Sequence, residues 1–236
     1  VLVIYININK TGKEKFTFFY RVFKIARTWG FIKILLFIPY EIFYGIKYNV
    51  NTLFSLNNQE LDVNKERKVH STEYFPTPYY IANKVFKLVR NKLAGSVFID
   101  FGSGAGRILM FVTQFGPKKI IGVEFSKKLC DKAISNLNKY FNTMNNTYTD
   151  WEIKHCDALE YDFPLDSNVF FFYDPFGPII IQQIIEKIKL SLEQNNRGII
   201  IIYISPIHRK IFSEMGFQLI HSKVNKYNKG FVIFKN

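Results

Sequence analysis

A glycine cluster directly after a strand-like run constrains the fold of this chain more than any other feature. Residues 97–107 read VFIDFGSGAGR, in which an apolar run ends at Asp100 and three glycines follow within five residues. Glycine loses more backbone entropy on folding than any other residue, so such a cluster needs a geometric reason. A positive φ or a close approach to the backbone supplies one. We therefore expect a tight turn there, with a ligand lying against its backbone.

Strand-like and helix-like segments alternate on both sides of this turn. Several of the strand-like segments are apolar nearly throughout, which is typical of a parallel sheet covered by helices on both faces. The sequence therefore predicts a doubly wound, Rossmann-like α/β domain with seven strands. The expected strands are SVFIDF, KKIIGVE, WEIKHCD, NVFFFYD, RGIIIIYI, FQLIHSKV and KGFVIFK, and the expected helices span residues 79–91, 107–114, 127–140, 179–192 and 207–215.

Residues 1–68 differ in character, and we expect them to form a helical extension and a linker before a domain at 69–236. From Phe16 onward, apolar positions recur at helical spacing with basic residues between them. The stretch at 29–46, WGFIKILLFIPYEIFYGI, contains two charges and a central proline, which makes it a poor transmembrane helix. Two readings stay open for these helices: they pack on the main domain, or they lie on a membrane surface.

Charge and cysteine content bear on the partners, the metal sites and the cellular location that we expect. The formal net charge of +13 favours contact with polyanions such as nucleic acid or an anionic membrane, and residues 1–50 alone hold eight Lys or Arg against two Glu. Cys130 and Cys156 make no disulfide framework and match no metal-ligand spacing, so we expect no metal site. No cleavable signal peptide is evident. We expect a cytoplasmic protein, peripheral to a membrane if its first helices bind one.

A carboxylate follows the second expected strand about twenty residues after the glycines. In IIGVEFS, Glu124 stands where an acidic side chain accepts hydrogen bonds from ribose hydroxyls in nucleotide-binding sheets. Dinucleotide-dependent dehydrogenases and methyltransferases that use S-adenosylmethionine share this arrangement. Two further strand ends favour the second class: HCDA places Asp157 where it can accept from an adenine amino group, and FFFYDPFG follows the fourth strand. A dehydrogenase gives neither of them a role.

Taken in order, these four strand ends resemble those of the class I S-adenosylmethionine-dependent methyltransferases, over about residues 72–236. A YFPT element at 74–77 is similar to the Y-x-P-T of small methyltransferases, many without an assigned substrate. The D-x-G-S-G-x-G-R loop resembles that of lysine methyltransferases acting on histone or on an ATP synthase subunit. The resemblance implies S-adenosyl-L-methionine as the cofactor.

The resemblance also implies which residues hold the cofactor. The glycine loop contacts the methionine part and the ribose, Glu124 binds both ribose hydroxyls, and Asp157 holds the adenine against Phe125. Tyr74 and Thr77 close over the methionine end. Plainer readings remain: Phe125 packs in the core, YFPTP only turns the chain, and Asp157 caps the next turn. The implied cofactor-binding residues are Tyr74, Thr77, Asp100, Gly102, Ser103, Gly104, Gly106, Glu124, Phe125, Asp157 and Ala158.

The fourth strand end bears on the methyl acceptor. Amino-group methyltransferases carry [DNS]-P-P-[YFW] there, whereas this chain has D-P-F-G, without the second proline. We expect Asp174 to accept hydrogen bonds from an acceptor amine, with Tyr173 and Phe176 beside it; the alternative is a turn before a helix. The expected function is methyl transfer to a protein lysine or another amine. The alternatives are an RNA or DNA methyltransferase, or a non-catalytic, membrane-associated module that binds the cofactor.

Overall fold

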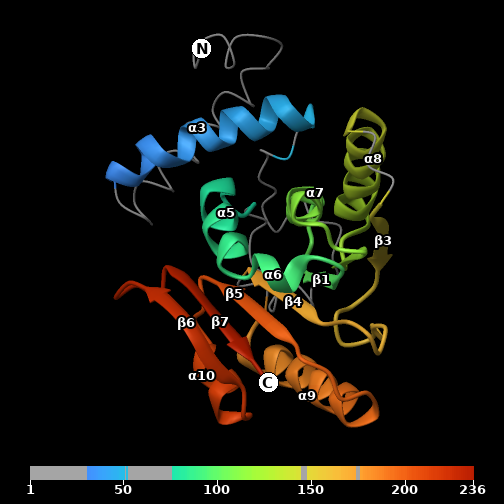
Figure 1. Cartoon of the computed structure of the whole chain (residues 1–236), viewed down its shortest axis with the longest axis vertical. Coiled ribbons are helices and arrows are strands. Elements are labelled where there is room, and N and C mark those ends of the chain that lie inside the picture. Colours follow the sequence, from blue (N-terminus) through green and yellow to red (C-terminus); the bar gives the residue numbers. More distant parts are fainter. Residues whose placement is uncertain (1–30, 51, 53–75, 145–147, 174–175) are drawn as a thin grey trace.

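A single sheet of seven strands with helices on both faces forms the domain (Figure 1). The computed structural model describes residues 31–50, 52, 76–144, 148–173 and 176–236. The strands are β1 (Val97–Phe101), β2 (Lys119–Glu124), β3 (Asp150–His155), β4 (Val169–Tyr173), β5 (Ile200–Ile204), β6 (Gln218–Val224) and β7 (Gly230–Lys235). The helices are α3 (Phe31–Tyr48), α5 (Tyr79–Leu88), α6 (Arg90–Leu93), α7 (Arg107–Val112), α8 (Lys127–Met144), α9 (Pro178–Gln194) and α10 (Arg209–Glu214), with a 3-10 turn η1 (Thr113–Phe115) after α7. The predicted doubly wound α/β fold is confirmed.

The strand order β3-β2-β1-β4-β5-β7-β6 gathers the ends of the central strands at one side of the sheet. Strands β1 to β5 pair in parallel, and β7 runs antiparallel between β5 and β6. The register pairs Phe101 with Val123 and with Phe172, and Glu124 with His155. The last residues of β1 to β4 therefore lie together along one edge, which we call the carboxyl edge. The opposite edge, where these strands begin, is the amino edge.

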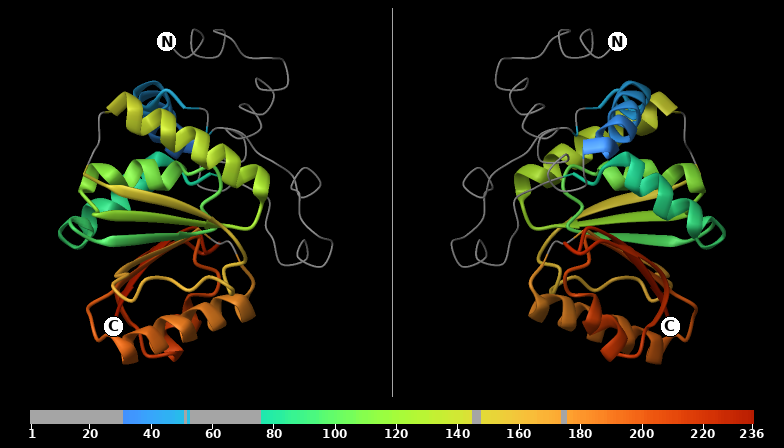
Figure 2. Two further views of the ribbon diagram at one scale, coloured as in Figure 1. Left: turned by 90° about the vertical axis from the view of Figure 1, so that its right-hand side faces the viewer. Right: turned by 90° about the vertical axis from the view of Figure 1, so that its left-hand side faces the viewer.

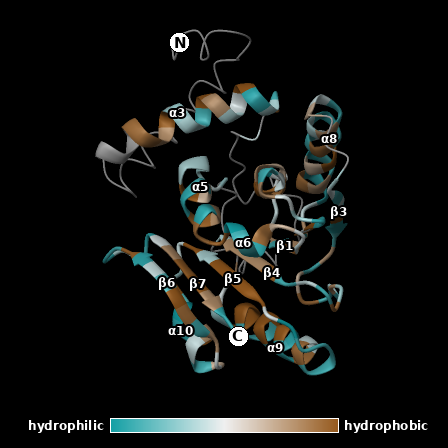
Figure 3. Ribbon diagram, in the orientation of Figure 1, coloured by the Kyte–Doolittle hydropathy of each residue, from teal (hydrophilic) through white to brown (hydrophobic). Residues whose placement is uncertain are grey.

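Two hydrophobic cores lie on opposite faces of the sheet. Helices α3, α5, α7 and α8 cover one face, and α9 and α10 cover the other (Figure 2). Because side chains alternate along a strand, β1 sends Phe98 into the first core and Ile99 into the second. All five residues of β1 are buried, and Figure 3 shows the apolar colour along β4, β5 and β7 and on α9 and α3. This burial on both faces explains the unbroken apolar runs in the sequence.

Helix α3 packs on the helical layer of the first face. Its Tyr44 ring lies 4.9 Å from the Tyr79 ring and 4.8 Å from the Phe111 ring, and Tyr48 lies 5.0 Å from Tyr140, all between ring centroids. Packing on the domain is thus observed for this helix. In the described part of the chain no helix is both long and apolar enough to cross a membrane. The helix expected from Phe16 lies outside the described residues, and the boundary at residue 68 stays a prediction.

Candidate functional site

The glycine loop leaves the end of β1 and turns into α7 at the carboxyl edge. Gly102, Gly104 and Gly106 have φ values of 80°, 53° and 77°, in the left-handed region that favours glycine. A Cβ on Gly106 would lie 3.3 Å from the Cβ of Ala133, so this glycine lets α7 start close to α8. The Asn136 side chain donates from Nδ2 to the Ala105 carbonyl oxygen at 2.9 Å and holds the loop to α8. The predicted strand–turn–helix is confirmed.

Glu124, the last residue of β2, is buried beside this loop. Its two carboxylate oxygens accept from the Gly104 N–H at 2.9 Å and from the Ser126 N–H at 3.0 Å. These two bonds fix the orientation of the carboxylate. Glu124 therefore lies against the glycine loop, and its contact with ribose hydroxyls stays a prediction. Ser103 has its hydroxyl buried against Gly122.

Asp100, in β1, is a second buried carboxyl group at this edge. Burial raises its pKa well above 3.8, and the nearby charge of Glu124 raises it further. Among the described residues, no hydrogen bond involves the Asp100 carboxyl group, although its side chain is almost fully enclosed. An unpaired buried carboxyl group is costly, and a neighbouring cation relieves that cost. Asp100 and Glu124 thus place two buried carboxyl groups near each other at this edge.

The turn after β3 lies next along the same edge. The Asp157 side chain accepts from the Leu159 N–H through Oδ1 at 3.0 Å. This is the kind of hydrogen bond expected if Asp157 caps the next turn. Ala158 is buried in the core on the α9 face. Phe125 is half-buried, and its carbonyl oxygen lies 3.1 Å from His155 Nε2. Contact of Asp157, Ala158 and Phe125 with adenine stays a prediction.

Comparison with known proteins bears on the fold. No family model and no curated protein matches the chain. A presumed O-methyltransferase from Nostoc punctiforme has a TM-score of 0.50 at 16% identity, over 66% of this chain and 55% of that one. Magnesium protoporphyrin IX methyltransferase from Synechocystis, solved with bound S-adenosylmethionine, gives 0.48 at 15% over 65% and 76%, and a presumed RNA methyltransferase from Pyrococcus horikoshii gives 0.48 at 21% over 75% and 93%. The fold is that of the class I methyltransferases. At such identities the likeness concerns the fold alone, which hosts many functions.

An ion pair behind the glycine loop of this methyltransferase fold was missed by sequence reasoning. The Arg107 guanidinium donates to the Glu41 carboxylate, to the Thr77 carbonyl oxygen at 3.0 Å and to Thr52 Oγ1 at 3.2 Å. It also lies 3.8 Å from the centre of the Tyr79 ring, and the Tyr79 N–H donates to Glu41 at 2.9 Å. Thus α3 and the starts of α5 and α7 are tied together. An acidic residue within the apolar run of α3 was the available signal.

Gly122, inside β2, is a second position that sequence reasoning missed. A Cβ there would lie 2.6 Å from Ser103 Oγ, 2.7 Å from Leu109 Cδ1 and 2.8 Å from Ile153 Cδ1. Only glycine lets the loop and α7 pack this closely on the strand. A glycine within a strand often marks such a close backbone approach, so its position in IIGVE was a usable signal.

Five predicted residues belong to the fourth strand end and the YFPT element, and the structure describes three of them. Tyr74 and Asp174 are outside the described residues, so their predicted roles are not tested. Tyr173 ends β4 and packs with the core under α3 and α5, whereas Phe176 packs with the core under α9. Thr77 is buried, and its carbonyl oxygen accepts from Arg107.

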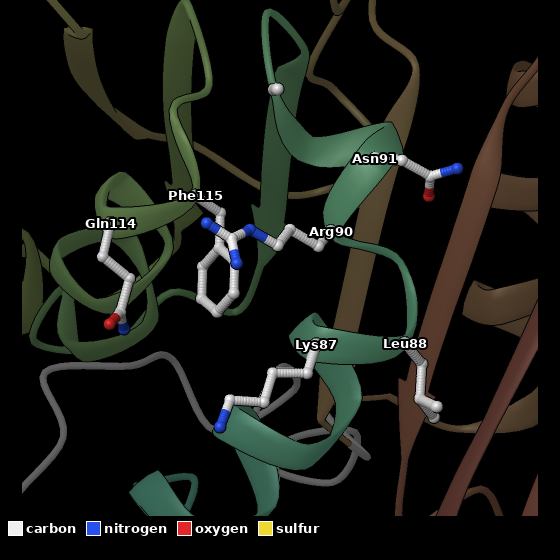
Figure 4. A pocket seen from close by; sticks show the side chains of 7 residues that line it. Lys87, Leu88, Arg90, Asn91, Gln114 and Phe115 are labelled. Atoms are coloured by element: carbon white, nitrogen blue, oxygen red, sulfur yellow. The ribbon is translucent and has the colours of Figure 1, made fainter.

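Two hollows among the described residues lie away from this site, at the amino edge. One is lined by side chains of α5, α6 and η1, among them Lys87, Arg90, Gln114 and Phe115 (Figure 4). A second contains Lys47, Gln114 and Lys118, so the two share Gln114. Neither includes a residue from the glycine loop or the predicted cofactor set. The candidate active site at the carboxyl edge is therefore distinct from the open, basic surface at the amino edge.

Proposed function

We propose that this chain is an S-adenosylmethionine-dependent methyltransferase that acts on a protein lysine or another amine. The observation that carries the proposal is the pair of buried carboxyl groups, Asp100 and Glu124, beside three glycines in left-handed conformation. These groups sit at the carboxyl edge, where ligands bind in open α/β sheets.

The residues of the carboxyl edge fit this cofactor chemically. S-adenosylmethionine carries a sulfonium and an ammonium group, both positive, and a ribose with two hydroxyls. Glu124 is an acceptor held in a fixed orientation by two backbone N–H groups. Burial and the charge of Glu124 raise the pKa of Asp100, and a positively charged ligand beside it favours its ionised form. When bound, the cofactor brings a methyl group on a positively charged sulfur, so its leaving group needs no further activation.

Alignment is what the chain itself must then provide. A displacement at carbon needs the attacking nitrogen in line with the bond that breaks, and holding two reactants in that geometry removes much of the barrier. The glycine loop and Glu124 hold one reactant at the ends of β1 and β2. We assign the second to the end of β4, where Asp174 accepts hydrogen bonds from a neutral amine and Tyr173 and Phe176 flank it from opposite faces of the sheet. This part rests on the sequence, because Asp174 lies outside the described residues.

Binding of S-adenosylhomocysteine, measured by isothermal titration calorimetry, tests the cofactor assignment. We expect Glu124→Gln to weaken binding by about 10- to 100-fold, because charge-assisted hydrogen bonds to the ribose are lost. Glu152→Gln on β3 is the matched control and should leave affinity unchanged, since Glu152 pairs with Lys119 and Lys154 and interacts with Tyr161, none of which belongs to the predicted cofactor set. No binding by the unaltered protein at millimolar concentration would overturn the assignment.

Transfer of a labelled methyl group into a cell lysate tests the acceptor. Asp174→Asn should keep its affinity for S-adenosylhomocysteine and lose transfer by about 100-fold or more, the scale of a positioned proton acceptor. Label that protease releases and nuclease does not supports the amine of a protein. Label released by nuclease would replace it with RNA or DNA methylation. Binding of the cofactor with no transfer to any fraction would favour the non-catalytic module.

A further inference from the structure

Helix α3 presents apolar side chains on both of its sides. Its inner side buries Phe37, Tyr44 and Tyr48 in the first core. Its outer side carries Leu35, Phe43 and Ile46, whose exposed fractions are 75%, 57% and 60%. A surface helix normally turns charged and polar residues outward, so an apolar outer side indicates an environment other than water. We call Leu35, Leu36, Phe43 and Ile46 the outer stripe.

Basic side chains adjoin the carboxyl end of this stripe. Lys47, which follows Ile46 on α3, lines the same hollow as Gln114 and Lys118, and Gln114 also lines the hollow of Lys87 and Arg90. Figure 4 shows Lys87 and Arg90 extending from α5 and α6 on the side of Gln114 and Phe115. We call Lys47, Lys87, Arg90 and Lys118 the basic rim.

The positive charge is a property of this layer rather than of every helix. Helices α5 and α6 contain four Lys or Arg and no acidic residue, and the single acid of α3, Glu41, is buried against Arg107. On the other face of the sheet, α9 holds two Lys and two Glu. The bias toward basic residues is thus greater in the helical layer that contains α3 than in α9.

We infer that the outer stripe and the basic rim together form a docking surface for a bilayer with anionic headgroups. The apolar side chains enter the boundary between headgroups and acyl chains, and the cations contact lipid phosphates, as in helices that lie along a membrane surface. Two copies of this chain are a poor alternative because their basic rims would repel. Nucleic acid offers phosphates but nothing that buries Leu35, Phe43 and Ile46. The inference gives α3 the interfacial reading that its sequence left open.

Co-sedimentation of the full chain with vesicles tests the surface. We expect binding to vesicles of 70% phosphatidylcholine and 30% phosphatidylserine in 0.1 M salt, and little binding to pure phosphatidylcholine. The variant Leu35→Gln/Phe43→Gln/Ile46→Gln should bind at least about tenfold more weakly, because the apolar area it buries is lost. Lys87→Gln/Arg90→Gln should weaken binding by about fivefold for each cation removed.

Matched controls come from α9 on the opposite face. Ile179 and Leu190 are 69% and 55% exposed, so Ile179→Gln/Leu190→Gln removes similar apolar area from the wrong face, and Lys189→Gln removes an exposed cation there. These variants should bind vesicles like the unaltered protein. Equal losses from both faces, no loss from the stripe variant, or no vesicle binding at all would overturn the inference. The inference would also be overturned if the unaltered protein were a dimer and the stripe variant a monomer.

The outcome is separable from the proposed function. Every substituted side chain is exposed and none contacts the glycine loop, so all of these variants should bind S-adenosylhomocysteine normally. Loss of vesicle binding with retained cofactor affinity supports the surface alone. Failure of the unaltered protein to bind the cofactor would leave the vesicle result standing on its own.

Discussion

Charged side chains are buried at the carboxyl edge of the sheet and exposed at the amino edge. At the carboxyl edge the charged groups Asp100, Arg107 and Glu124 are buried, and the last two are held by several hydrogen bonds each. At the amino edge Lys87 and Arg90 are exposed and line an open hollow. A buried charge depends on its partners, whereas water and salt screen an exposed one. The exposed Lys87 and Arg90 are therefore available to a charged partner at the amino edge, whereas the buried charges of the carboxyl edge are held by their own neighbours.

The sharpest way to break this comparison is to remove an arginine from each edge. Arg107→Met should lower the free energy of unfolding by about 3–5 kcal/mol, because it leaves Glu41 buried without its partner. Arg90→Met should change it by about 0.5 kcal/mol or less, as for most surface substitutions. Urea denaturation followed by circular dichroism measures both.

Two companion variants keep this prediction testable if Arg107→Met does not fold. Arg107→Lys keeps the charge and loses part of the hydrogen-bond set, so its loss should be smaller. Glu41→Gln/Arg107→Met removes both charges and should recover part of the stability lost by the single variant. Similar losses from Arg90→Met and Arg107→Met would contradict the contrast between the edges.

Sequence patterns placed the local elements well because their signals are local. The apolar runs, the positive φ of Gly104 and the position of Glu124 at the end of β2 were all readable within a few residues. The ion pair was not, because Glu41 and Arg107 are 66 residues apart and only the packing of α3 on α7 brings them together. The sequence indicated that α3 is apolar but not which of its sides the core covers. The close approach of the loop to Gly122 could not be read either, because it depends on how the loop packs on β2.

Replacing one glycine near each edge by alanine compares how tightly the two edges are packed. Gly122→Ala places a methyl group within 2.8 Å of three side chains, one of them from the glycine loop, and should cost about 1–3 kcal/mol of unfolding free energy. Gly198→Ala, just before β5 at the amino edge, meets no atom within 4 Å and should cost far less. Thermal unfolding measures the difference. Affinity for S-adenosylhomocysteine should fall only in Gly122→Ala; an equal cost at both sites would show that the packing beneath the loop is loose.

The contribution of Asp100 to the free energy of unfolding should fall as the pH rises. Burial raises its pKa in the folded protein above 3.8, so the folded state holds the proton more tightly than the unfolded chain. The resulting stability is fully present below pH 3.8 and is lost as the pH rises through the raised pKa. Asp100→Asn removes this slope and should gain about 1 kcal/mol at pH 7, where the wild-type carboxyl is costly to bury. Urea titrations between pH 3 and 8 measure it, and an unchanged slope would contradict the raised pKa.

Asp166, at the amino edge, should show the opposite sign and the smallest effect. A hydrogen bond from Lys118, 2.7 Å away, lowers the pKa of Asp166, so its contribution is present above pH 3.8 and is lost as the pH falls through the lowered pKa. Both side chains are more than half exposed, which limits the contribution to about 0–1 kcal/mol. Asp166→Asn should therefore change the free energy of unfolding little in 0.1 M salt and not at all in 1 M salt, because salt screens the exposed pair. The effect of Asp100→Asn should persist in 1 M salt, because the buried carboxyl group is not screened. Salt insensitivity at both positions, or sensitivity at both, would remove the distinction between the two edges.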